Sequence, residues 1–135
     1  MPMPAATLGH TVVATDKHIV LVPPPAPGPP VPTPLPHPFS GIITGGCSTK
    51  VLINGKPAAT VGSTATNTPP HLPTPPGTAF VNPPTNQATI VVGSPLVLIE
   101  GKPAARNGDA ALTCNDPVPL PAGVVVAVST VMIGP

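Results

Sequence analysis

Apolar and polar residues alternate in short blocks along this chain, and the blocks recur. Three β-branched runs each lead through a Gly or Ala and a Ser into a second apolar run, which ends at a Gly. The first runs are residues 42–43, 90–92 and 124–126, and the second runs are residues 51–53, 97–99 and 131–133. β-branched residues favour strands and Gly marks turns. The pattern therefore predicts that each pair of runs forms a β-hairpin.

The repeated unit is longer than these two runs. Pro-Ala-Ala occurs at residues 4–6, 57–59 and 103–105, and a Gly follows each copy three positions later. Residues 48–59 match residues 94–105 closely, while a third copy is split, its front half at 129–135 and its back half at 3–9. Such repetition indicates one supersecondary unit used three times. We therefore expect the third unit to be completed by both termini, which should meet in space.

The chain shows no sustained helical period, so the sequence predicts one all-β domain over residues 1–135 with three-fold pseudo-symmetry. Its 26 Pro and 13 Gly would alone suggest low complexity, but the Val, Ile and Leu runs argue against disorder. We place the prolines in three loops, at residues 23–38, 69–84 and 117–121. Proline fixes φ, so these loops can be stiff without regular hydrogen bonding.

Charge gives little indication of a polyanionic partner. The chain has five Lys and Arg against four Asp and Glu, and its aromatic residues are Phe39 and Phe80. It therefore has neither the basic stripe that binds a phosphate backbone nor the aromatic side chains that stack on bases, so nucleic acid is not expected as a partner. Lys56 and Lys102 follow turn glycines and are expected to be exposed charges at hairpin tips. No basic segment precedes a long apolar one, so we expect no signal peptide, synthesis in the cytoplasm and no membrane-spanning segment.

The repeat also places residues that can bind a metal. His18 and His71 each come nine residues after the glycine of their copy, and Cys114 comes six residues after the glycine of its copy. Three equivalent loops should thus each bring one ligand towards the pseudo-three-fold axis. His37, between two prolines, is the best candidate for a fourth ligand. Three imidazoles and one thiolate suit a closed structural Zn²⁺ site.

Two alternatives concern these ligands. His10 directly follows a turn glycine and is interpreted as a surface residue, although it could replace His37 as a ligand. A disulfide between Cys47 and Cys114 is the rival to the metal, but two cysteines without a secretory signal are weak evidence for one. Cys47 precedes a predicted second strand and is interpreted as a small packed thiol.

Residues 53–59 and 99–106, followed by Gly108-Asp109 and then a Cys, resemble the PAAR-repeat family, which is named after Pro-Ala-Ala-Arg. The resemblance covers nearly the whole chain, although the first two copies end in Thr7 and Thr60 instead of Arg. It implies a compact conical β-structure with one zinc near its apex, bound by three His and one Cys. By position these ligands are His18, His37, His71 and Cys114.

The resemblance also implies a function. Proteins of this family cap and sharpen the trimeric, VgrG-like spike of contractile injection systems, which are type VI secretion systems or related phage-tail-like particles, and some carry effectors. We expect one tip per trimer, docked through a broad apolar base rich in Val, Ile and Ala. The protein would be assembled in the bacterial cytoplasm, delivered outside the cell or into a target, and meet a membrane only by puncturing it. Whether the machine is a type VI secretion system or an extracellular particle stays open at this point.

Two other functional classes were considered. A zinc hydrolase needs an open metal position and a nearby carboxylate base, whereas Glu100 falls in a hairpin turn and four ligands would fill the shell. Asp116, close to Cys114, is the nearest candidate for such a base. We therefore expect no catalysis. A proline-rich adaptor that binds aromatic grooves through residues 23–38 is the second alternative.

Overall fold

The computed structural model describes residues 2–25 and 27–134, and this part of the chain contains strands but no helix, which confirms the predicted all-β class. Met1, Ala26 and Pro135 lie outside the described residues. The predicted third copy of the repeat ends at Pro135, so its last position is not described. Within the described residues, no helix suited to crossing a membrane is found. The strands are β1 (Met3–Pro4), β2 (Thr11–Val22), β3 (Val31–Gly45), β4 (Leu52–Ile53), β5 (Lys56–Pro57), β6 (Thr64–Asn67), β7 (Ala79–Phe80), β8 (Gln87–Ile90), β9 (Leu98–Ile99), β10 (Lys102–Pro103), β11 (Ala110–Thr113), β12 (Leu120–Val126) and β13 (Met132–Ile133).

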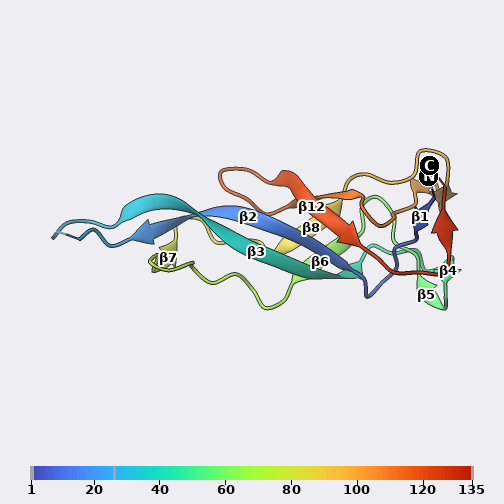
Figure 1. Ribbon diagram of the computed structural model, residues 1–135, viewed down its shortest axis with the longest axis horizontal. Helices are drawn as coiled ribbons and strands as arrows, with labels where there is room; N and C mark the ends of the chain where they lie inside the picture. Colours follow the sequence, from blue (N-terminus) through green and yellow to red (C-terminus); the bar gives the residue numbers. More distant parts are fainter. Residues whose placement is uncertain (1, 26, 135) are drawn as a thin grey trace.

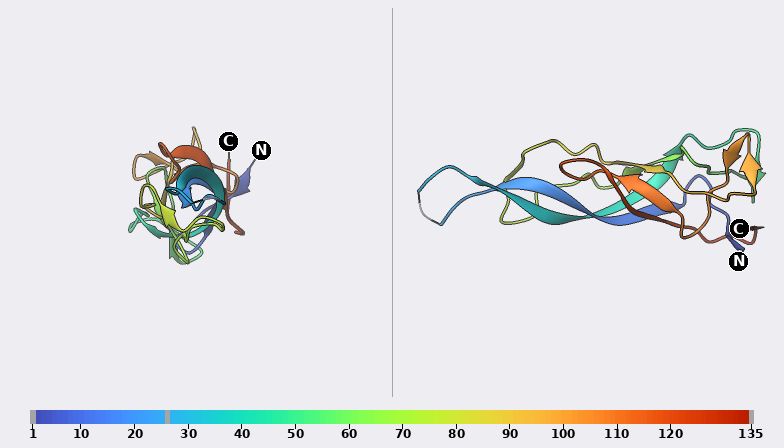
Figure 2. Two further views of the ribbon diagram at one scale, coloured as in Figure 1. Left: turned by 90° about the vertical axis from the view of Figure 1, so that its left-hand side faces the viewer. Right: turned by 90° about the horizontal axis from the view of Figure 1, so that it is seen from above.

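The main sheet closes on itself. Its strand order is β12-β11-β8-β6-β3-β2-β7, and β12 also pairs with β2, so that the strands encircle a core, as the end-on view in Figure 2 shows. Antiparallel neighbours with alternating buried and exposed side chains make this arrangement. The barrel is filled by small and branched side chains, among them Val12, Ile43, Ala65, Ile90 and Val125.

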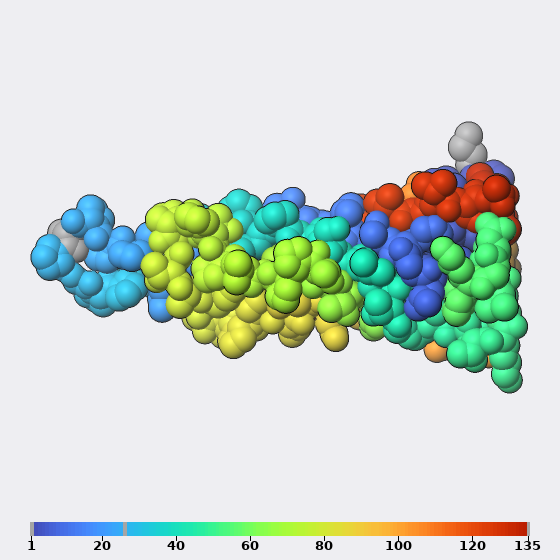
Figure 3. All heavy atoms as spheres, turned by 90° about the horizontal axis from the view of Figure 1, so that it is seen from below, coloured from blue at the N-terminus to red at the C-terminus, as the bar shows by residue number. Residues whose placement is uncertain are grey.

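The molecule tapers from one end to the other. β2 pairs with β3 along its whole length, and the two strands run beyond the rest of the sheet, so that they form the narrow end (Figures 1 and 3). The broad end carries β1, β4 and β5 together with both chain termini. This tapered, all-β molecule agrees with the conical shape that the family resemblance implies.

The first proline-rich segment is not a loop throughout, contrary to the prediction for residues 23–38. Its second half belongs to β3, where prolines occupy every second position and pair with Thr15, Lys17, Ile19 and Leu21 of β2. The carbonyls of Lys17, Ile19 and Leu21 accept hydrogen bonds from outside β3, so the backbone groups of these pairs point away from each other. A proline there removes no hydrogen bond to β2. Alternating proline is therefore compatible with a strand that is paired on one edge.

The Pro-Ala-Ala segments meet at the centre of the broad half, which explains their composition. Ala6 donates to the carbonyl of Ala105, Ala105 to that of Ala59, and Ala59 to that of Ala6, each at 3.0 Å. These three residues and their preceding alanines are fully buried. Three backbones approach one axis here, so a side chain larger than methyl would meet the neighbouring segments.

The hairpins differ from the predicted ones. The first β-branched runs join the main sheet, and each second run pairs with the segment after its turn, as β4 with β5 and β9 with β10. Asn54 and Gly55 both have positive φ, at 52° and 79°, as do Glu100 and Gly101. Consecutive positive φ values close a two-residue hairpin directly around the turn, so the earlier run is not the partner.

The third such pair is made by the two ends of the chain. β1 pairs with β13, with Met3 opposite Ile133, and the termini lie together in both side views (Figures 1 and 2). The prediction that the termini meet is confirmed by this pairing.

The predicted apolar surface of the broad end is confirmed only for valine, because Val97 and Val131 are exposed while the isoleucines and alanines are buried. Ile53, Ile99 and Ile133 are buried with alanines in a second core cluster. Strand alternation turns the preceding residue outwards. Leu52, Leu98 and Met132 are accordingly 58%, 59% and 52% exposed. Lys56 and Lys102 are exposed, as predicted.

Candidate metal centre

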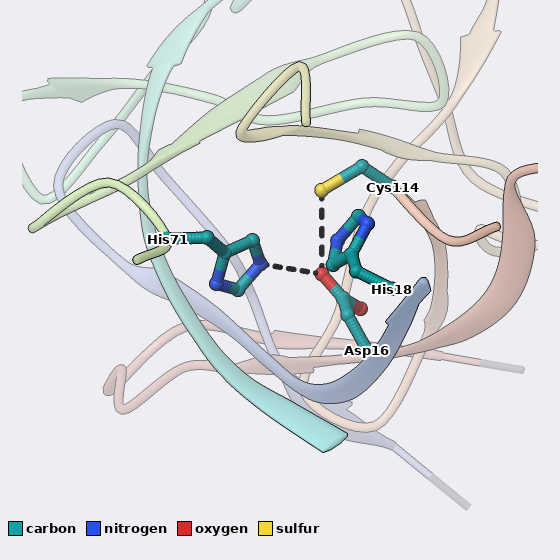
Figure 4. Close-up of side chains that lie close together, drawn as sticks. All are labelled: Asp16, His18, His71 and Cys114. Atoms are coloured by element: carbon teal, nitrogen blue, oxygen red, sulfur yellow. Dashed lines mark hydrogen bonds and ion pairs between the residues drawn. The ribbon is translucent and has the colours of Figure 1, made fainter. Parts of the chain in front are cut away.

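Four side chains that can bind a metal converge inside the tapered half of the molecule. The ligand atoms of Asp16, His18, His71 and Cys114 all lie within 4.8 Å of one another, and all four residues are buried (Figure 4). Asp16 and His18 come from β2, His71 from the segment after β6, and Cys114 directly follows β11. The structure thus brings together three of the residues that the sequence singled out, with His18 on a strand instead of a loop.

Residues 114–116 reach β2 through side chains. Asn115 Oδ1 accepts a hydrogen bond from the backbone N–H of Lys17 at 2.7 Å, and the N–H of Asp116 donates to the Lys17 carbonyl at 2.8 Å. Asp116 Oδ2 accepts the N–H of Ile19 at 2.9 Å. These bonds fix Cys114 beside the strand that carries Asp16 and His18.

His71 contacts Asp16 through Nε2, which lies 3.0 Å from Asp16 Oδ2. The other ring nitrogen, Nδ1, lies 3.3 Å from the amide nitrogen of Asn67, while Asn86 accepts the backbone N–H of His71 at 2.8 Å. The amide of Asn67 can only donate to a deprotonated Nδ1, so the network assigns the proton of His71 to Nε2. To bind a metal through Nε2, the neutral ring would carry its proton on Nδ1 instead, and the Asn67 amide group would have to turn away from it.

His18 provides the test of whether this site fits a metal. Its ring is buried, and neither Nδ1 nor Nε2 has a hydrogen-bond partner. Buried polar groups are almost always satisfied, so an imidazole without a partner beside a carboxylate and a thiol fits a site that binds a cation. Burial, followed by the proximity of His71, lowers the pKa of His18, which favours the neutral, metal-binding form.

Cys114 is a free thiol, and so is Cys47, which packs beside the barrel core. The Sγ atom of Cys114 lies 3.3 Å from Asp16 Oδ2. Burial and, next, the charge of Asp16 raise the pKa of Cys114 to about 11. The thiol is therefore protonated in the absence of a metal, and a bound cation would be needed to form the thiolate.

His37 lies next to the cluster but both its nitrogens are engaged. Its ring centroid is 5.3 Å from that of His18 and 5.6 Å from that of His71. Nδ1 lies 2.8 Å from the carbonyl of Leu35, and Nε2 accepts the backbone N–H of Thr74 at 3.1 Å. Burial lowers the pKa of His37, so its ring is also held neutral. To bind a metal through Nε2, His37 would have to release the Thr74 amide.

Asp16 is the member of the cluster that sequence reasoning missed. Its side chain is fully buried, and no Lys or Arg forms an ion pair with it among the described residues. The signal was present in the sequence, because Asp16 and His18 are two positions apart and therefore point to the same face of a strand. His10 lies elsewhere, half-buried, with its nitrogens near the N–H of Thr7 and the carbonyl of Val128.

A hollow of about 370 Å³ adjoins the cluster on one side. Among its lining residues are His37, His71, Leu72 and Thr74. It reaches the two histidines that lie on this side of the cluster. A metal site needs an entry path from solvent, and this hollow borders two of the histidines.

The donor set of imidazole, thiol and carboxylate is one that Zn²⁺ prefers, and all of it is buried as in structural sites. The sequence profile of the PAAR motif matches residues 34–119, which is nearly two thirds of the chain. That range includes His37, His71 and Cys114, while His18 precedes it. No curated protein sequence matches the chain.

Proposed function

This chain belongs to the PAAR motif family, and we propose on that basis that it forms the tip of the spike of a contractile injection system, either a type VI secretion system or a related extracellular particle. Its role is structural. The tapered β-structure would sit on the end of the trimeric spike with its broad end, so that the paired strands β2 and β3 point forwards. The protein would be assembled in the bacterial cytoplasm and leave the cell with the particle.

A single zinc ion would stabilise this tip. We assign it to His18, His71 and Cys114, with His37 as the fourth ligand once its Nε2 exchanges the Thr74 amide for the metal. The observation that carries the site is the unsatisfied, buried ring of His18. The zinc would supply no catalysis but a cross-link between β2, the segment after β6 and the segment after β11.

The broad end offers three similar surfaces to a trimer. Leu52, Leu98 and Met132 occupy equivalent positions on three two-residue ladders and are exposed to nearly the same degree. Three equivalent apolar contacts on one chain suit a partner with three-fold symmetry. We therefore expect one copy of this chain per spike trimer, bound through these residues.

Co-purification with the spike protein tests the proposal. The purified complex should contain one tip and three spike chains by native mass spectrometry. Leu98→Glu should abolish the complex while zinc stays bound. Val31→Glu is the matched control, because Val31 is 51% exposed but starts β3 far from the broad end, and it should leave the complex intact. A one-to-one complex, or binding that survives Leu98→Glu, would refute this mode of docking.

A further inference from the structure

Asp116 holds its loop on β2 through two hydrogen bonds and also contacts the ring of His18. Its backbone N–H and its Oδ2 bond β2 on either side of His18, to the carbonyl of Lys17 and the N–H of Ile19. The same Oδ2 lies 3.5 Å from Nδ1 of His18, and the Asp116 side chain is nine-tenths buried. The carboxylate is thus held against one particular nitrogen of the ring.

That nitrogen has no other partner. Both nitrogens of His18 are buried and unsatisfied, and the 3.5 Å contact to Asp116 is longer than an N–H···O hydrogen bond by about half an ångström. A shift of about half an ångström would bring the two atoms to hydrogen-bond distance. Only an Nδ1–H can donate to the carboxylate, so this contact favours the tautomer whose Nε2 carries a free lone pair.

We propose that Asp116 is a positioning residue, which accepts the Nδ1 proton of His18 and so presents Nε2 of His18 to the metal. The inference rests on the metal site proposed above, and it concerns the tautomer and orientation of one ligand. Histidines that bind metals commonly donate their other N–H to a carboxylate, which fixes the ring and increases its basicity. Asp116, which the sequence offered as a catalytic base, is given this different role.

Asp116→Asn is the informative variant. The atom that faces Nδ1 of His18 is the one that accepts the Ile19 N–H, so an asparagine that keeps the Ile19 bond offers Nδ1 only a neutral, weaker acceptor. An asparagine that turns its NH₂ group towards Nδ1 loses the Ile19 bond and offers Nδ1 a donor. In both orientations the preference for the Nδ1–H tautomer is weakened. We expect zinc affinity, measured by competition with a chromophoric chelator, to fall about 10–100-fold. The melting temperature of the metal-free protein should change little. Glu100→Gln removes an exposed carboxylate and should leave zinc affinity unchanged.

Nitrogen NMR of the His18 ring gives a second measurement that needs no metal. In the metal-free wild type, Nδ1 should carry the proton, and in Asp116→Asn the fraction of rings that carry the proton on Nε2 should rise. An Nε2–H tautomer in the metal-free wild type, or wild-type zinc affinity in Asp116→Asn, would overturn the role of Asp116. A wild type that binds no zinc would refute the metal site itself, whereas the NMR measurement would still decide which atom Asp116 faces.

Discussion

The backbone N–H of Ala59 donates a hydrogen bond of 3.0 Å to the carbonyl of Ala6, which joins two copies of the repeated segment. Together with the equivalent bonds through Ala105, it closes a ring of three amides around the axis. No copy can form this ring alone. The three segments must therefore order together, and the ring couples the N-terminal part of the chain to the two hairpins that follow.

Enlarging a member of this ring should destabilise the whole fold. Ala59 is fully buried, and Val in its place adds two methyl groups where neighbouring backbones are in contact. We expect Ala59→Val to lower the free energy of unfolding by about 1–3 kcal/mol in denaturant titrations. Ala79→Val is the control, because Ala79 is exposed and lies in a strand that tolerates a β-branched residue. Equal stabilities of the two variants would contradict the crowding of the axis.

Zinc should be present in gently purified protein and should contribute to its stability. We expect about one zinc per chain by elemental analysis, and removal by a chelator should cost about 4 kcal/mol of unfolding free energy when free zinc is about a thousand times its dissociation constant. His71→Ala and Cys114→Ser should each lower both the zinc content and the melting temperature. Protein that is metal-free without exposure to a chelator would speak against the site.

The fourth ligand can be identified by comparing two neighbours of the cluster. If His37 binds the metal as proposed, His37→Ala should weaken zinc binding more than Asp16→Asn, because the latter removes a charge near the metal but no ligand. The two variants can be compared by zinc competition and by the absorption of the cobalt-substituted protein, which reports the number and kind of ligands. The reverse order of affinities would assign the fourth position to Asp16.

Zinc uptake should release a proton from Cys114. Burial, with the charge of Asp16 nearby, raises the pKa of this thiol to about 11, so it is protonated in metal-free protein near neutral pH. Burial lowers the pKa values of His18 and His37, so neither ring contributes a proton. Calorimetry in buffers of different ionisation enthalpy should therefore show about one proton released per zinc, and affinity should rise about tenfold per pH unit above neutrality. In Cys114→Ser this release should disappear. Zinc affinity independent of pH would exclude the thiolate as a ligand.

The pairing of β1 with β13 predicts tolerance to circular permutation. A permutant that links the two ends and opens the chain within residues 27–30, at the tip of the β2–β3 hairpin, should fold, because every strand stays intact. A permutant opened between Leu35 and Pro36 divides β3 and should be insoluble or unstable. Expression and circular dichroism would separate the two, and the opposite result would exclude the closed arrangement of the ends.

Aligning the three copies of the repeat predicted much of this structure, because equivalent residues make equivalent contacts. It predicted the meeting of the ends and the closeness of His18, His71 and Cys114. The alanines were expected on the apolar base, whereas they are buried around the axis. The alignment did not find Asp16, which has no counterpart in the other copies. The role of a buried carboxylate depends on the side chains around it in three dimensions, and the spacing of residues within the repeat does not show which side chains those are.

The two errors in the predicted fold, a loop in place of part of β3 and the wrong hairpin partners, came from relying on the local preferences of single residue types. Proline disfavours strands in general, so residues 31–38 were assigned to a loop, although their alternation matches a strand with one unpaired edge. The hairpin pairing was wrong because the longer β-branched runs were taken as partners. The turn at Asn54-Gly55 instead fixes which residues face each other.

The prolines of β3 also determine what the narrow end cannot do. Where β3 extends beyond β6, prolines stand at the positions whose amide would point away from β2, at residues 32, 34, 36 and 38. The outer edge of this segment offers carbonyl acceptors but no N–H donors, so a strand from another molecule cannot add to it. A pointed β-structure with an ordinary open edge would adhere to unfolded or strand-rich proteins that it meets. Along this edge of β3 the prolines remove the donors that such adhesion needs, so a chain that meets it finds acceptors alone.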